Sequence, residues 1–367
     1  MSKTIIFYAP FGKDTPPEKI GGAEAGCLKT LDCYRKGSFN VVQVHKPTMN
    51  SGLFRYLVDL LITPFIILWQ LMKHRHSILH VAGFYLKLVY YEAFLIYIAK
   101  LVRHNTIYEI RNGGMIESFY EGSSLYKWAL KKLISNSSQV LCQGLEYVDF
   151  IQKKWNRYTF YYPNYIREGY LSERPRARTD DLQLNLIYFG RIAESKNVDV
   201  IIEVFSHVSN KYPQAKLNLI GGYSNEYKCR LDAQLSAKNL RQDQVIFHGR
   251  QDFDYIHAEL IKSHYFIFPS IETREGHSNS LTEAMGVGVV PIVSNAGFNA
   301  SICGQDDLVI KTLQADLYAE CLFSIEESLQ WEIISDTVRK RVAENYTEKL
   351  ISERLITEVN LLFENKH

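Results

Sequence analysis

The sequence predicts an α/β protein built on parallel β-sheets. Between Tyr265 and Ser294 an apolar run of strand length is followed by a polar loop, a short helix and a second apolar run. This order, with its short connections, is typical of a parallel α/β sheet. Near the amino terminus, a strand is followed by a glycine-rich loop and a helix, which repeats the first part of this pattern. The 367 residues are enough for two domains of ordinary size.

The composition is that of a globular cytosolic protein. Hydrophobic residues make up 46% of the chain and charged residues 22%. The six cysteines show no paired spacing, so we expect reduced thiols. The first strand follows Met1 almost directly, so we expect no signal peptide and a cytoplasmic location.

The charge differs between the two halves. Residues 1–170 contain 21 Lys+Arg and 12 Asp+Glu, a net charge of +9, whereas the remainder contains 21 and 28, a net charge of −7. A basic surface can meet anionic lipid, nucleic acid or a phosphorylated acceptor. No zinc-finger spacing or RNA-binding motif is present, so we expect no nucleic acid partner.

In the amino-terminal half the expected strands cover residues 4–8, 41–44, 78–81, 106–111 and 139–142. A helix should begin near Ala23, directly after Gly21 and Gly22. A strand, a Gly-Gly loop and a helix form a geometry that lets a phosphate approach the backbone. A plain tight turn is the alternative explanation.

Residues 53–72 form the most unusual segment, LFRYLVDLLITPFIILWQLM, followed by Lys-His-Arg-His. Its length approaches a membrane span, but Arg55, Asp59 and Pro64 lie inside it, so we do not predict a span. It is either a helix buried against the sheet or an apolar surface with basic flanks that docks on anionic lipid. A second apolar stretch, 85–102, ends in Arg-His.

In the carboxyl-terminal half the expected strands cover residues 184–189, 217–220, 245–247, 265–268 and 289–293, and the expected helices 198–212, 315–328, 331–345 and 346–365. Residues 167–183 read as a linker. Arg191 directly follows the first of these strands, and Lys196 precedes a helix. Two cations beside a helix start can hold a diphosphate, although surface ion pairing is the common alternative.

The loop after strand 265–268 carries two carboxylates, Glu275 and Glu283. Glu275 lies in the loop and Glu283 one turn into the helix, so one can face a reacting group while the other accepts hydrogen bonds from a diol. Gly276 and Ser278 permit close approach to the backbone. Ser280 and Glu283 have the spacing of a capping box. The alternative is that Glu283 only caps its helix and that Glu275 is a solvated charge.

This stretch, PS-x(4)-EGHSNSLTEAM-x-x-G-x-x-PIVS-x-x-G, resembles the signature of glycosyltransferase family 4, retaining enzymes of the GT-B fold. The resemblance implies two Rossmann-like domains that face each other across a cleft. These would be an acceptor domain at 1–168, with a membrane-facing surface near 53–76 and 85–104, and a nucleotide-sugar domain at 184–345. A helix at 346–367 would cross back to the first domain.

The resemblance also assigns roles to single residues. Glu275, Arg191 and Lys196 would be catalytic. The donor would contact these cations and a further set: Gly21, Gly22, His248, Gly276, His277, Ser278, Asn279, Ser280, Leu281 and Glu283. Gly21, Gly22 and Glu24 match a GG-x-E element that faces the donor. Family members often have a histidine that contacts the sugar. Here His80 and Arg111 end two strands; Arg111 departs from the pattern and could bind an acidic acceptor or a phosphate, and His80 is more simply a packed histidine.

By this resemblance the protein is a retaining hexosyl- or N-acetylhexosaminyltransferase that needs no metal or other cofactor. UDP is the nucleotide most common in the family. The basic half favours a lipid-linked oligosaccharide acceptor at the inner membrane surface, for capsule or other cell-surface polysaccharide. A soluble small acceptor and a non-catalytic scaffold are the alternatives. Asp252-Phe-Asp254 spells a D-x-D metal motif, but its place before a helix makes Asp252 a cap.

Overall fold

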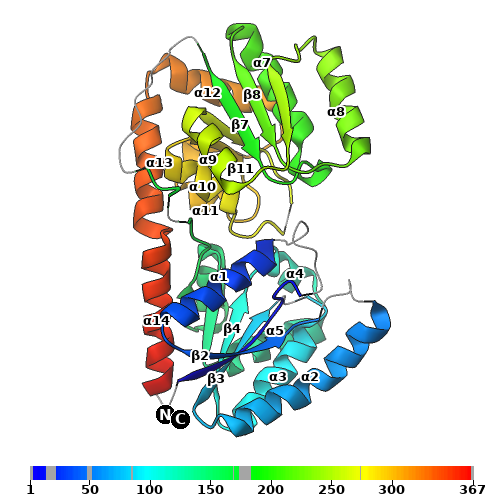
Figure 1. The fold of residues 1–367 in the computed structure, drawn as a ribbon, viewed down its shortest axis with the longest axis vertical. Helices are drawn as coiled ribbons and strands as arrows, with labels where there is room; N and C mark the ends of the chain where they lie inside the picture. The colour runs from blue at the N-terminus through cyan, green and yellow to red at the C-terminus, as the bar shows by residue number, and fades with distance from the viewer. Residues whose placement is uncertain are drawn as a thin grey trace. The chain divides into compact units, whose positions relative to one another are not determined.

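A computed structural model of the protein describes residues 3–13, 22–47, 52–83, 86–167, 169–172, 183–272 and 274–364. The chain divides into two compact units, Met1–Asn164 with Lys349–His367 and Tyr165–Glu348. Each contains a six-stranded parallel sheet covered by helices (Figure 1). The predicted fold class is confirmed: both units are doubly wound α/β structures.

The sheet of the amino-terminal unit has the strand order β2-β1-β3-β4-β5-β6. Its strands are β1 (Thr4–Ala9), β2 (Asn40–His45), β3 (Ser77–Gly83), β4 (Asn105–Ile110), β5 (Gln139–Cys142) and β6 (Phe160–Tyr161). Its helices are α1 (Gly22–Lys36), α2 (Leu53–Lys73), α3 (Val89–Leu101), α4 (Met115–Glu121), α5 (Ser124–Asn136), α6 (Leu145–Trp155) and, from Lys349 onward, α14 (Glu348–Glu364).

The helices α2, α3 and α5 lie side by side on one face of this sheet (Figure 1). The crossover from β1 to β2 runs in the opposite direction to the later ones, so right-handed connections place α1 on the other face. Helix α14 packs on this unit. Lys3 Nζ donates to Asn360 Oδ1 at 2.6 Å, and Asn105 Nδ2 donates to the Leu362 carbonyl at 2.6 Å.

Helix α2 presents an unusual surface. Only Thr63, Ile67 and Leu71 are buried, so the expectation that this segment is a helix buried against the sheet is wrong. By length and composition alone, α2 is apolar enough to cross a membrane; our prediction that it does not span one remains a prediction. We call the exposed side chains of α2 and α3 the α2–α3 apolar face: Leu53, Phe54, Leu57, Leu61, Ile62, Phe65, Ile66, Trp69, Met72, Tyr90, Phe94, Tyr97 and Leu101.

The carboxyl-terminal unit has the strand order β12-β11-β10-β7-β8-β9. Its strands are β7 (Asn185–Phe189), β8 (Lys216–Ile220), β9 (Val245–Gly249), β10 (Tyr265–Phe268), β11 (Val290–Ser294) and β12 (Val309–Ile310). Its α-helices are α7 (Val198–Lys211), α8 (Asn225–Ala237), α9 (Phe253–Lys262), α10 (Asn279–Val287), α11 (Asn299–Cys303), α12 (Ala315–Glu327) and α13 (Trp331–Asn345). Two short 3₁₀ helices, η3 (Glu194–Lys196) and η4 (Asp306–Leu308), complete it.

The structure tests two predicted helix caps, at Asp252 and at Ser280. Asp252 Oδ1 accepts from the Tyr255 amide at 3.0 Å, which confirms that Asp252 caps α9. The capping box expected for α10 is wrong in register. Ser278 is the N-cap and accepts from the Leu281 amide at 3.3 Å, whereas Ser280 already lies inside the helix. Serine is favoured at the N-cap in either position, so the residue type alone did not separate Ser278 from Ser280.

A buried polar network occupies the amino-terminal unit. His80 is fully buried, and its Nε2 lies 3.2 Å from Glu109 while its Nδ1 lies 2.8 Å from the Tyr34 hydroxyl. Glu109 also pairs with Arg111 at 2.7 Å, and Arg111 donates to Thr30 Oγ1 at 2.5 Å. A neutral ring protonated on Nε2 can donate to Glu109 and accept from Tyr34. Burial lowers the pKa of His80, against the opposing effect of Glu109.

This lowered pKa predicts a loss of stability in acid. As the pH falls below about 6.5, the usual pKa of histidine, the unfolded chain takes up a proton that the folded ring resists. The free energy of unfolding should then fall by at most about 1.4 kcal/mol per pH unit from this group. Urea unfolding of His80→Gln between neutral and mildly acidic pH should show a shallower fall than the parent protein. The exposed His207→Gln is the control, and an unchanged slope in His80→Gln would contradict the assignment.

Candidate active site

The predicted site residues of the carboxyl-terminal unit gather at the carboxyl ends of β7 and β10. The two strands are hydrogen-bonded neighbours, with Tyr265 beside Leu186 and Phe266 beside Ile187. The strand order reverses here, because β8 and β9 extend to one side of β7 while β10 and β11 extend to the other. Ligands of open α/β sheets bind outside the strand ends at such a switch point.

The loop after β7 needs an unusual backbone. Gly190 has φ +141° and Gly221, after β8, has φ +155°. A Cβ on Gly221 would lie 1.7 Å from the Gly190 carbonyl oxygen, so only glycine permits the two loops to touch. Arg191 follows directly, and its side chain is 65% exposed.

Lys196 is the last residue of η3, and the next residue, Asn197, fixes its position. Asn197 adopts a left-handed conformation, φ +49°, which asparagine tolerates better than most residues. Its Nδ2 donates to the Pro269 carbonyl at 2.7 Å and so ties η3 to the end of β10. The Lys196 side chain is only 11% exposed.

Two carboxylates surround the Lys196 ammonium group. Glu275 forms an ion pair with it, and Glu272 Oε2 lies 2.6 Å from Nζ. Glu272 also lies 3.4 Å from the Arg191 guanidinium. Sequence reading predicted both cations and Glu275 but missed Glu272. The position of Glu272 in the loop, four residues past the end of β10, was the signal that could have revealed it.

Glu275 is held in place from several sides. Ser270 Oγ donates to Glu275 Oε2 at 2.9 Å, and Ser294 Oγ donates to the Ser270 carbonyl at 2.5 Å. The Glu275 side chain is 13% exposed, so the alternative that Glu275 is a solvated loop charge is wrong. Gly297 has φ +55°, and a Cβ there would lie 2.1 Å from the Glu275 carbonyl oxygen. The loop after β11 therefore packs directly on the backbone of Glu275.

The loop continues from Glu275 and Gly276 into the start of α10. His277 and Ser278 are buried, and the His277 ring packs edge-on against Tyr346 at 4.9 Å. The amides of Asn279 and Ser280 have no acceptor among the described residues, as expected for the first turn of a helix. Such amides attract anions. Leu281 is buried in this turn and Glu283 is half-buried in the next, where its charge contributes to the raised pKa of Tyr170, a shift due first to burial.

The other predicted contacts lie elsewhere. His248 is on the edge strand β9, and its ring nitrogens lie 2.8 Å from Asn218 Oδ1 and 2.7 Å from the Tyr255 hydroxyl. In the amino-terminal unit, Gly22 begins α1 and Glu24 lies in its first turn, whereas Gly21 is outside the described residues. His80 and Arg111 belong to the buried network described above. With His80 at 0% and Arg111 at 4% exposure, neither presents a surface to a ligand in this structure.

The arrangement suits an anionic ligand. Arg191, Lys196 and the amides at the start of α10 supply positive charge, and the two glutamates balance the lysine. No group of three or more His, Cys, Asp or Glu side chains placed to hold a metal occurs in the part of the chain that the structure describes. A diphosphate would compete with Glu272 for Lys196 and Arg191.

The carboxyl-terminal half of the chain is similar to known glycosyltransferases. Residues 172–349 match the family described as glycosyl transferases group 1. The gpi3 subunit of phosphatidylinositol N-acetylglucosaminyltransferase from Schizosaccharomyces pombe is 21% identical over 190 residues, which are 52% of this chain and 40% of that protein. The aligned region thus spans less than half of this relative.

Solved structures match nearly the whole chain. Sucrose-phosphate synthase from Thermosynechococcus elongatus has a TM-score of 0.73 and 15% identity, and covers 99% of each chain. HepE from Anabaena, solved in complex with UDP, has a TM-score of 0.72 and 13% identity, and covers 98% of this chain and 100% of that one. Residues 172–349 thus match the glycosyl transferases group 1 family, and the chain has the GT-B fold.

Proposed function

We propose that the protein is a retaining, metal-independent glycosyltransferase that moves a sugar from a nucleotide-sugar, with a UDP-sugar favoured, to a lipid-linked oligosaccharide. The observation that carries this proposal is the cluster of Arg191, Lys196, Glu272 and Glu275 beside the start of α10. The UDP bound to HepE supports the choice of nucleotide. The reaction would serve cell-surface polysaccharide synthesis, such as capsule, on the cytoplasmic side of the membrane.

The chemistry follows from the charges. The bond between the anomeric carbon and the diphosphate oxygen breaks, and negative charge develops on the leaving group. Arg191, Lys196 and the α10 amides would stabilise that charge. Glu275 would orient the sugar and favour positive charge at the anomeric carbon, and Glu283 would hold the ribose diol. The acceptor oxygen bonds to the same face of the sugar, and its proton passes to the leaving phosphate oxygen.

The lipid-linked acceptor is proposed from the amino-terminal unit. The α2–α3 apolar face brings together thirteen large exposed side chains on two helices that contact each other, and basic residues follow α2. An apolar helix face with cationic flanks suits the boundary between headgroups and acyl chains of an anionic bilayer. The Schizosaccharomyces pombe relative is named for phosphatidylinositol, a phospholipid, which agrees with a lipid acceptor. The protein would then act as a peripheral membrane enzyme.

The first test is calorimetric titration of the protein with UDP and with GDP, with and without EDTA. We expect UDP to bind more tightly, with no effect of EDTA. Lys196→Ala should weaken UDP binding roughly ten- to hundredfold, because charge-assisted hydrogen bonds to the diphosphate are lost. Lys238→Ala, at an exposed lysine directly after α8, is the matched control. Binding of neither nucleotide would overturn the proposal, and binding that EDTA abolishes would overturn metal independence.

Glu272 provides a prediction of opposite sign. Because its carboxylate competes with a diphosphate for Lys196 and Arg191, Glu272→Gln should tighten UDP binding by roughly two- to fivefold, the range expected for a partly exposed pair. Weaker binding in the same titration would show instead that Glu272 positions the cations for the ligand.

Gly297 connects stability with the site. Gly297→Ala places a side chain at a left-handed backbone and against the carbonyl of Glu275, so we expect the free energy of unfolding to fall by about 1–3 kcal/mol. UDP binding should weaken with it. The control is Gly222→Ala, where the nearest atom to an added Cβ is 3.9 Å away. Equal urea midpoints for the two variants would contradict the close packing of this loop.

A further inference from the structure

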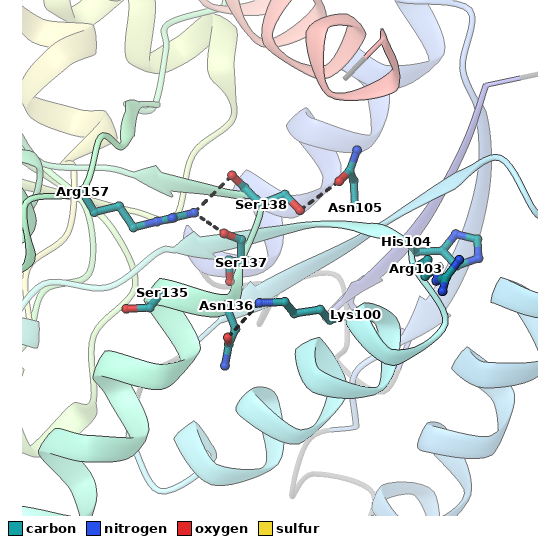
Figure 2. Close-up of a pocket in the computed structure, with 9 residues that line it drawn as sticks. All are labelled: Lys100, Arg103, His104, Asn105, Ser135, Asn136, Ser137, Ser138 and Arg157. Atoms are coloured by element: carbon teal, nitrogen blue, oxygen red, sulfur yellow. Dashed lines mark hydrogen bonds between the residues drawn. The ribbon is translucent and has the colours of Figure 1, made fainter. Parts of the chain in front are cut away.

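A basic pocket lies in the amino-terminal unit at the edge of the sheet where β4 and β5 begin. This edge is opposite to the carboxyl ends of the strands. The pocket has a volume of about 460 Å³ (Figure 2). Its lining comes from the ends of α3 and α5 and from the segments that follow α5 and α6: Lys100, Arg103, His104, Asn105, Ser135, Asn136, Ser137, Ser138 and Arg157.

The pocket carries positive charge without a compensating acid. Three cations and one histidine line it, and no Asp or Glu does. No ion pair joins Lys100, Arg103 or Arg157 to any residue that the structure describes. Lys100 Nζ donates only to the neutral Asn136 Oδ1, at 3.2 Å. Cations that gather around a cavity with serine and asparagine groups provide the donors that a phosphate needs.

Arg157 forms one wall of the pocket. One of its terminal nitrogens donates to the carbonyls of Ser137 and Ser138, the latter at 3.2 Å, and so caps the end of α5 (Figure 2). Capping uses only part of the guanidinium. Its Nε is buried and has no acceptor among the described residues. Burial lowers the pKa of Arg157, and an anion in the pocket would favour its charged form.

Arg103 occupies a position where glycine would be favoured. It follows the end of α3 with φ +60°, and its amide donates to the Lys100 carbonyl at 3.0 Å. A left-handed residue after a helix is usually glycine, because a side chain is strained there. The strained backbone thus keeps an exposed cation at the pocket. Helix termination does not explain the choice of arginine, whose side chain has no partner among the residues that the structure describes.

The surroundings of the pocket indicate what binds. A second pocket of about 220 Å³ shares Arg103, His104 and Asn105 and adds Arg75 from the segment after α2. An apolar groove of about 480 Å³ between α2 and α3 is lined by Phe65, Phe94 and Ile98 among others. On α3, the exposed Tyr97 of the α2–α3 apolar face lies one turn before Lys100, which lines the basic pocket. The apolar face therefore reaches the cationic cavity along α3.

We infer that the basic pocket binds the phosphate of an anionic phospholipid headgroup while the α2–α3 apolar face contacts the acyl region. This site deepens the membrane docking of the proposed function and rests on it. The neighbouring α2–α3 apolar face favours a lipid over a free phosphate ion, because a soluble anion would use only the cations. Binding at a fixed pocket would orient the unit on the bilayer, which diffuse attraction does not do.

The test is co-sedimentation with phosphatidylcholine vesicles, with and without phosphatidylglycerol. The variant Lys100→Gln/Arg103→Gly should weaken binding to the anionic vesicles roughly thirtyfold, about fivefold for each cation lost. Its thermal midpoint should be unchanged or higher, since Arg103→Gly removes backbone strain. The control is Arg35→Gln, an exposed cation of α1 outside the pocket, which should bind vesicles like the parent protein.

Several results would overturn the inference. Equal losses in the double variant and in Arg35→Gln would mean diffuse electrostatic attraction rather than a pocket. Unchanged vesicle binding by the double variant would remove the pocket's role. Calorimetric binding of inorganic phosphate that is lost in the double variant, without vesicle binding by the parent protein, would assign the pocket to a soluble anion.

Vesicle binding through the pocket and UDP binding by the donor site can be tested separately. The double variant should bind UDP like the parent protein, because none of the proposed donor contacts lines the basic pocket. Vesicle binding through the pocket without UDP binding would leave the pocket standing and remove the donor proposal. UDP binding with vesicle binding that ignores the double substitution would keep the enzyme and its membrane docking but remove the headgroup site.

Discussion

The parallel pairing of β7 with β10 is the constraint on which the candidate active site depends. These strands are separated in sequence by two other strands and their helices, yet their backbones are hydrogen-bonded to each other. Strand β10 occupies the side of β7 that β8 leaves free, and the loops after both strands then emerge together. Arg191 and Lys196 meet Glu272 and Glu275 only for this reason.

The meeting has an electrostatic consequence. A nearly buried lysine needs a counter-charge, and in this structure two glutamates provide it. Ser270, Ser294, Asn197 and Gly297 fix the geometry of that cluster through hydrogen bonds and close packing. A site arranged in this way is preorganised, because its charged groups are held before a ligand arrives. An incoming diphosphate would replace one anionic partner of Lys196 with another.

The two units manage charge in different ways. In the amino-terminal unit the buried charges are paired internally, as in Lys46 with Glu92 at 2.5 Å and Arg111 with Glu109. The surplus cations lie on the surface, and several collect at the edge of the sheet opposite to the strand carboxyl ends. Apolar side chains of α2 and α3 border them. This unit thus combines a self-contained interior with a surface that is both apolar and basic.

Local patterns predicted the local structure. The strand at 265–268, the helix that Asp252 caps and the helix at 331–345 follow from apolar runs and capping residues, because these depend on near neighbours in the chain. The family resemblance supplied the expected roles of Glu275, Arg191 and Lys196. One local prediction was wrong: Ser278 rather than Ser280 caps α10, since two serines offered the same hydrogen bond.

What sequence could not supply was long-range contact. Glu272 beside Lys196, Gly297 against Glu275 and Arg111 against Thr30 all join residues that are far apart in the sequence. The exposure of α2 depends in the same way on which of its sides meets the sheet. The sequence by itself determined the order and type of the elements, because hydrogen bonds and apolar spacing within a segment decide them. Only the tertiary structure decided which charges meet and which face water, because strand order and packing depend on the whole chain.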